Sequence, residues 1–343
     1  MMQIDIPYYE DLSRISNSNI GWFLQKGPAY LHKMLTNPPP EEKNYVLERG
    51  TLIHEYLLQP EEFQKDYVVW DKSRPTSAQQ EKFCQALAST LEIEPNRAIL
   101  SAYKEAYSAA GKSEDKMLSE GLKIASTLKD YIDFLKANDG RTMISPYEYQ
   151  MLEKIRNNIE AHKLAKKLLW PVEQMKNYSG DGWENVMNEC EYKHEFHINW
   201  NYEGKIECKS LLDSLTLDFK NKKATIMDLK TTAKLWHFEE SIDMYDYLRQ
   251  LNYYSMAVRW YLVNECNITA EEIFEWDFNY YIIGIDTTGS NEIRVFKIDK
   301  YMISSRDETI MTALDRIAWH QKNNKWEHSI EYYEGDGSET LNL

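Results

Sequence analysis

The segment ATIMDLKTT, residues 224–232, decides the fold, because it forms an apolar β-strand that ends in two charged side chains. Asp228 and Lys230 are two residues apart, so on a strand both side chains lie on one face. An acid followed two residues later by lysine also occurs at 41–43, 114–116, 191–193 and 207–209, and a single such pair usually forms a solvated ion pair. Any functional argument for Asp228 therefore depends on its neighbours.

The preceding predicted strand supplies a second acid, Asp213, in the segment CKSLLDSL, residues 208–215. If the two strands pair, Asp213 and Asp228 can converge on one hard cation, with the Leu229 carbonyl as a third oxygen ligand. Lys230 would then stand beside the metal, where it could orient or activate a water for phosphodiester hydrolysis. The alternative for Asp213 alone is an acid at a strand edge that only keeps the surface soluble.

Two helical segments carry further polar candidates. His54 lies in RGTLIHE, residues 49–55, four residues after a glycine, and a lone histidine is more often a bystander. Gln250 and Tyr254 are four residues apart and so share one helix face. By themselves, these two indicate only a polar patch on a packed helix.

The order of patterns along the chain predicts a mixed α/β fold with a helical block before the sheet. Residues 8–70 contain two helices, the first with Ser16 or Ser18 as its N-cap and the second running from Tyr45 to Leu58. Residues 75–180 are mostly helical, with no strand-like alternation. The remaining predicted elements are strands at 189–200, 205–217, 223–230, 276–285 and 292–298, helices at 244–264 and 301–322, and an acidic tail of low order at 327–343.

Composition limits the function classes. The chain has 343 residues, a net charge of −15 and four widely spaced cysteines, which argues against a general nucleic-acid coat, a disulfide framework and a zinc ribbon. A local basic groove is still compatible with this charge. No apolar run is long enough for a membrane span and no signal peptide is evident, so we expect a soluble intracellular protein.

The motifs together resemble a known family. DLKTT after a strand with Asp213, Q-x-x-x-Y on the next helix and G-T-x-I-H-x-x-L-L upstream are similar to the PD-(D/E)XK nucleases, within them to the phage-type exodeoxyribonuclease VIII (RecE-like) group. The resemblance covers residues 8–70 and 185–300. It implies a restriction-endonuclease-like core at 185–322, a mixed central sheet flanked by helices, in one nuclease domain that spans 1–343.

The resemblance also implies roles for individual residues. His54, Asp213, Asp228 and the Leu229 carbonyl would bind Mg²⁺ or Mn²⁺, and Lys230 would be the catalytic lysine. Gln250 would support catalysis, and Tyr254, Arg249 and Lys209 would contact DNA. An acid on the strand before Asp213 is expected, and of the two candidates Glu191 and Glu195, we prefer Glu195. Leu211-Leu212 stands where the family often has Arg-Pro, which removes a possible phosphate contact.

The activity implied by the resemblance is a 5′-to-3′ exonuclease on double-stranded DNA ends that leaves 3′ tails for recombination. The resemblance also implies a ring-shaped homo-oligomer, a single-strand annealing protein as partner, and a location in the cytoplasm of a bacterium or a phage-infected host. Two alternatives stay open: an endonuclease or single-strand-specific nuclease of the same superfamily, and a catalytically inactive DNA-binding or accessory module that kept the fold.

Overall fold

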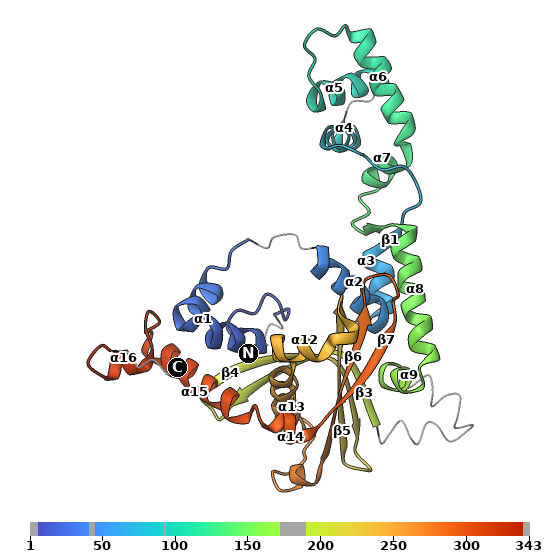
Figure 1. Ribbon diagram of the computed structural model, residues 1–343. Helices are drawn as coiled ribbons and strands as arrows, with labels where there is room; N and C mark the ends of the chain where they lie inside the picture. Colours follow the sequence, from blue (N-terminus) through green and yellow to red (C-terminus); the bar gives the residue numbers. More distant parts are fainter. Residues whose placement is uncertain (1–5, 41–44, 92–93, 172–189, 339–343) are drawn as a thin grey trace. The chain divides into compact units, whose positions relative to one another are not determined.

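The computed structural model describes residues 6–40, 45–91, 94–171 and 190–338 (Figure 1). The chain divides into two compact units, which we describe separately. The first joins Met1–Pro60 to Met151–Leu343, and the second is Glu61–Gln150. Residues 172–180 of the predicted helical block and 339–343 of the predicted tail lie outside the described residues.

A mixed five-stranded sheet organises the described part of the first unit. Its strands lie in the order β3-β4-β5-β6-β7. The β3–β4, β4–β5 and β6–β7 pairs are antiparallel, and β5–β6 is parallel. The strands are β3 (Cys190–Tyr202), β4 (Ile206–Asp218), β5 (Lys223–Thr232), β6 (Asp277–Asp286) and β7 (Ile293–Ile298).

Local sequence accounts for the connections between these strands. Glu203 and Gly204 have φ angles of 50° and 70°, and two consecutive positive values make the tight turn that joins β3 to β4. The parallel β5–β6 pair needs a longer crossover, and the helical segment between these strands supplies it. The crossover contains η2 (Leu235–His237), α12 (Phe238–Tyr245), α13 (Tyr247–Asn264) and η3 (Glu272–Glu275).

The helices of this unit cover the sheet and close its core. Helix α13 packs against β3, β4 and β5, and α1 (Asn17–Thr36) packs against α13 and α15 (Asp307–Asn323) (Figure 1). Helix α2 (Tyr45–Leu58) contacts β4 and β5. Ser16 caps α1 in a capping box with Asn19, so it is the first of the two predicted serines that starts the helix. The remaining helices are α9 (Lys163–Leu169), α14 (Lys300–Ser304) and α16 (Ile330–Glu334).

The second unit is helical with its own small core around Phe83, Tyr103 and Ile132. Its helices are α3 (Pro60–Asp66), α4 (Ala78–Ser89), α5 (Pro95–Ala106), α6 (Glu114–Thr127), α7 (Lys129–Lys136) and the start of α8 (Pro146–Ala161). Two three-residue strands, β1 (Tyr67–Val69) and β2 (Thr142–Ile144), pair in parallel. They are too short to show a period of two in the sequence, and so the expectation of no strand in this block was wrong at β2.

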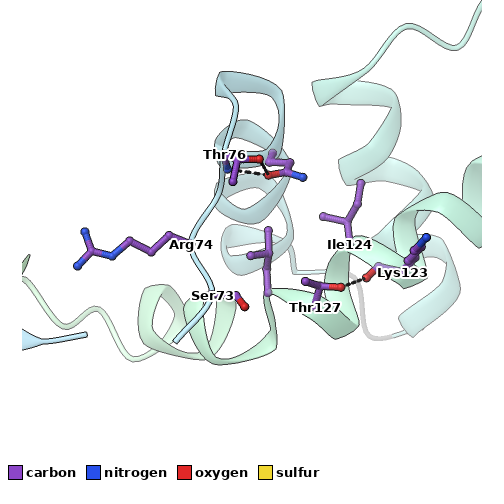
Figure 2. Close-up of a pocket in the computed structure, with 8 residues that line it drawn as sticks. Ser73, Arg74, Thr76, Lys123, Ile124 and Thr127 are labelled. Carbon is purple, nitrogen blue, oxygen red and sulfur yellow. Dashed lines mark hydrogen bonds between the residues drawn. The ribbon is translucent and has the colours of Figure 1, made fainter. Parts of the chain in front are cut away.

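A pocket of about 460 Å³ opens in the second unit beside α6 (Figure 2). Its threonines already have partners: the Thr127 hydroxyl donates to the Lys123 carbonyl at 2.9 Å, and the Thr76 hydroxyl donates to Gln80 at 3.0 Å. Figure 2 shows Arg74 directed away from the other lining residues. The lining contains no carboxylate, and the pocket therefore offers no metal chemistry.

Two predicted boundaries differ from the structure. Residues from Met151 onward belong to the first unit, because Arg49 donates to the Met151 sulfur and Trp170 donates to the Leu57 carbonyl. The acidic tail begins as helix α16, held by a bidentate pair of Arg316 with Glu331. In the described part of the chain, no helix combines the length and apolarity that crossing a bilayer requires.

The sheet core predicts how substitutions change stability. Ile282 is fully buried on β6, between Asp228 of β5 and Phe296 of β7. Ile282→Ala should lower the free energy of unfolding by about 2–5 kcal/mol, because it removes buried methyl groups and leaves a cavity. Met311→Ala on α15, where the side chain is 41% exposed, should change it by less than about 0.5 kcal/mol. If chemical denaturation shows that both variants lose the same free energy of unfolding, this assignment of the core is contradicted.

Candidate metal centre and active site

Three carboxylates stand at one level across neighbouring strands. On β3 and β4, His194 pairs with Ser214 and Phe196 with Leu212, so Glu195 and Asp213 occupy the positions between these pairs. On β4 and β5 the pairing ends at Ser214 and Met227, so Asp213 and Asp228 take the next positions. The strands part here, and the Leu229 amide donates to the Asp213 carboxylate at 2.6 Å. Strand register therefore gathers the three acids.

Glu195 adopts a left-handed backbone conformation, with φ at 45°. This conformation reverses the alternation of side chains along β3. Lys193 and Phe196 are three residues apart, which on a regular strand puts them on opposite faces, yet both contact the Tyr261 ring. A glutamate in this conformation in the middle of a strand is strained, and strained residues of this kind cluster at active sites.

The two candidate acids of β3 consequently separate. Glu195 joins the cluster, as we preferred, while Glu191 lies 3.3 Å from the Lys193 ammonium, outside the cluster. The period-two argument that put both on one face was wrong, because it assumed a regular strand.

Helix α2 brings His54 to these acids. Its Nδ1 lies 3.8 Å from Asp213 Oδ2 and 4.0 Å from Glu195 Oε1, distances too long for hydrogen bonds. One ligand atom from each of His54, Glu195 and Asp213 lies within 4.8 Å of the others. A hydrogen bond with the Leu229 backbone favours the protonated His54 ring, so the Leu229 carbonyl is the acceptor and lies beside the cluster, as predicted.

Asp228 and Lys230 form the second half of the site. The Lys230 ammonium is 2.6 Å from Asp228 Oδ2, and Gln250 donates to Asp228 Oδ1 at 3.2 Å. Gln250 also donates to the Tyr254 hydroxyl at 2.8 Å. Tyr254 is only 7% exposed, so its role in this structure is to hold Gln250 rather than to meet DNA. The predicted pair of Gln250 and Tyr254 thus fixes Asp228, which fixes Lys230.

Crowding of the acids changes their protonation. Burial, followed by the charges of Asp213 and Asp228, raises the pKa of Glu195 to about 8. Burial likewise raises the pKa of Asp228 to about 6, although the Lys230 ammonium opposes this change. Burial lowers the pKa of Lys230, but the Asp228 and Asp213 carboxylates outweigh it and raise the pKa overall. Lys230 is therefore a cation at neutral pH.

These residues fit a divalent cation. Burial and the Lys230 charge lower the pKa of His54 to about 4, so the imidazole is neutral and available as a ligand. Burial disfavours the ionised forms of Glu195 and Asp213 and raises both pKa values, and a bound cation would favour the ionised forms again. His54, Glu195 and Asp213 would hold the ion, with the Leu229 carbonyl nearby. Asp228, the other predicted carboxylate ligand, lies outside this group of three and is paired with Lys230 in the structure, so its role as a ligand stays a prediction.

The two predicted DNA-binding cations are committed to the protein interior. Lys209 is 5% exposed, and its ammonium donates to the Tyr8 and Asp11 carbonyls at 2.5 Å each. Arg249 is 6% exposed and lies beside Asp246. Its guanidinium packs against Gly21, where a Cβ atom would be only 3.0 Å from the Arg249 Nη2 atom. Neither side chain is free to contact DNA, which corrects the prediction. Sequence alone could not show which cations fold inward.

Glu55 is a site residue that the sequence did not reveal. Its negative charge contributes to the raised pKa of Glu195, and its Oε2 atom is buried without a hydrogen-bond partner among the described residues. Adjacent residues on a helix point about 100° apart, so helical spacing alone does not bring His54 and Glu55 to one site.

Comparison with known proteins identifies the family. The sequence profile of the PDDEXK-like domain of unknown function (DUF3799) matches residues 16–334. The chain therefore belongs to this family, and its fold is the predicted PD-(D/E)XK fold. Among solved structures, it is similar to a protein from Eubacterium rectale described as a "putative exonuclease", with 14% identity and a TM-score of 0.45, over 100% of this chain and 96% of that one. The search of curated proteins returned no significant match.

The family and the site together support a nuclease-like enzyme, a class in which carboxylates bind divalent metal beside a lysine. The geometry agrees with the expected order of motifs along the chain: His54 comes from the upstream helix, Asp213 and Asp228 come from paired strands, and Gln250 comes from the following helix.

The crowded acids predict the pH dependence of stability without metal. Glu195 has a pKa raised from 4.5 to about 8, so the folded protein holds its proton more tightly than the unfolded chain. The corresponding stability is complete below about pH 4.5 and is lost as pH rises to about 8. In thermal unfolding with a chelator, wild type should therefore lose more stability over this range than Glu195→Gln does.

Glu191→Gln is the control, because that carboxylate lies outside the cluster, and it should behave as wild type. Added Mg²⁺ or Mn²⁺ should raise the melting temperature of wild type more than that of Glu195→Gln. If the melting temperatures of all three proteins depend on pH in the same way, the raised pKa of Glu195 is contradicted.

Proposed function

We propose that the protein is a metal-dependent deoxyribonuclease that uses Mg²⁺ or Mn²⁺. The observation that carries the proposal is the convergence of His54, Glu195 and Asp213 within 4.8 Å, next to an Asp228–Lys230 pair at 2.6 Å. A neutral imidazole and carboxylates are ligands for a divalent cation, and a buried ammonium beside them can stabilise the negative charge of a phosphodiester.

The protein side chains have separable tasks in this proposal. A bound divalent ion would supply Lewis acidity, which stabilises charge on the phosphate and makes water a better nucleophile. Lys230, protonated and fixed by Asp228, would orient the attacking water and stabilise negative charge on the phosphate oxygens. Gln250 would keep Asp228 in place through its two hydrogen bonds, to Asp228 and to Tyr254. Lys230 is therefore a positioned cation and does not remove a proton.

The finer activity rests on the resemblance to the phage-type exodeoxyribonuclease VIII group. We propose digestion of one strand of duplex DNA from its end, 5′ to 3′, which leaves a 3′ tail for recombination. A homo-oligomeric ring and a single-strand annealing partner belong to the same proposal. A ring that gathers its cations inside would be compatible with the net charge of −15.

The catalytic lysine gives the most direct activity prediction. Lys230→Ala should lower the rate of Mg²⁺-dependent degradation of linear duplex by about a hundredfold or more, because it removes a preorganised cation from the reaction centre. Lys234→Ala is the matched control: its ammonium, 63% exposed and 3.7 Å from Glu240, lies four residues along the same segment. Equal rates for wild type and Lys230→Ala would contradict the proposal.

The mode of attack can be read from substrate topology. An exonuclease should degrade end-labelled linear duplex and leave covalently closed circular DNA intact, because it must enter at an end. Release of label from the 5′ end before the 3′ end would support the proposed polarity. Cleavage of the closed circle would show the endonuclease alternative instead.

A further inference from the structure

The N-terminal segment 7–11 is tied to β4 by a buried charge. The Lys209 ammonium donates to the carbonyls of Tyr8 and Asp11, and it lies 4.5 Å from the centre of the Tyr8 ring. The Asp11 carboxylate, 2% exposed, accepts hydrogen bonds from Ser13 and Arg14. A desolvated lysine that satisfies backbone carbonyls gives this short turn a fixed position on the sheet.

Within this turn, the two tyrosines face different surroundings. Tyr8 is half-buried and packs edge to face on His197, with 5.3 Å between ring centres. Tyr9 stands at 89° to Tyr8 at 5.2 Å, and it is 81% exposed. Tyr8 thus supports Tyr9 from one side, and most of the surface of Tyr9 is exposed to solvent.

Ring contacts connect Tyr9 to the strand that carries Glu195. Tyr9 packs on Tyr8, and Tyr8 packs on His197, two residues after Glu195 on β3. Burial raises the pKa of Tyr9, and the negative charges of Glu195 and Asp213 add to this effect. An exposed aromatic ring costs free energy in water and gains it on contact with another flat apolar surface. An unpaired nucleotide base offers such a surface, and aromatic stacking on bases is a common mode of single-strand binding.

We infer that Tyr9 is a substrate-binding platform that stacks on an unpaired base of the DNA strand next to the phosphate being cut. This inference rests on the proposed nuclease function and adds a recognition element to it. A base inside a duplex has both faces covered by its neighbours, so the platform selects a frayed or single-stranded end. The stacked base would place its own phosphate near Lys230 and the carboxylate cluster.

A cycle of protein and substrate changes tests this directly. The full-length protein is assayed with Mg²⁺ on 5′-labelled linear duplex, either normal or with an abasic nucleotide at the first, second or third position from the 5′ end. Tyr9→Ala should raise KM by roughly tenfold, within the range of about five- to hundredfold that stacking on one base accounts for, with little change in kcat. Tyr9→Phe and Tyr9→Trp should retain the wild-type KM, because both keep a flat ring.

The abasic substrates identify the partner of the ring. At one of the three positions, removing the base should raise the wild-type KM by the same factor, and should raise that of Tyr9→Ala no further. Tyr301→Ala, which removes an equally exposed tyrosine on α14, should behave as wild type on every substrate.

Four results would overturn the inference. Additive penalties of Tyr9→Ala and base removal, or an unchanged KM for Tyr9→Ala, would remove the stacking role while leaving the nuclease in place. If Tyr9→Phe raises KM as much as Tyr9→Ala does, the hydroxyl is required, and Tyr9 forms a hydrogen bond with the substrate instead of stacking on it. A wild-type protein that cleaves no DNA would remove the inference and the proposed function together.

Discussion

The removal of three neighbouring carboxylates from bulk water is the constraint on which the site depends. Glu195, Asp213 and Asp228 stand at one level of the sheet; Asp213 and Asp228 are buried and Glu195 is half-buried, so water cannot screen them fully. Lys230 pairs with Asp228 at 2.6 Å. Beside Glu195 and Asp213 lie the neutral His54 imidazole and the Leu229 amide, which donates to Asp213. Burial outweighs the Lys230 charge at both acids, so their pKa values are raised and a second positive charge would favour their ionised forms. A divalent ion at His54, Glu195 and Asp213 would supply that charge, and a phosphate could then approach an otherwise negative centre.

The sheet supplies the precision that this chemistry requires. Strand register, and not loop conformation, sets the level of the three acids, and the β4–β5 ladder ends where the Leu229 amide turns to the Asp213 side chain. Helix α13 then fixes Asp228 through Gln250, whose second hydrogen bond goes to the buried Tyr254. Ile282, the β6 partner of Asp228, is fully buried. Site geometry and core packing thus depend on the same strands, so a change in the core near β5 would also disturb the Asp228–Lys230 pair.

The sequence predicted what depends on local patterns. Apolar alternation predicted the five strands of the main sheet, and two-residue spacing placed Asp228 and Lys230 together. The alternation could not decide between Glu191 and Glu195, because nothing in the sequence of an alternating strand indicates that Glu195 takes the left-handed conformation. Burial of Lys209 and Arg249 was equally hidden, since a cation looks the same in sequence whether it binds phosphate or a backbone carbonyl. The division at Gln150 depends on long-range contacts of Met151 and Trp170, which helical patterns do not record.

Anomalous X-ray diffraction from crystals grown with Mn²⁺ would locate the ion itself. The account predicts a strong anomalous peak in coordination contact with the His54 imidazole and the Glu195 and Asp213 carboxylates, beside the Asp228–Lys230 pair. A peak bound only by other carboxylates, or no peak among these three side chains at a saturating Mn²⁺ concentration, would contradict it.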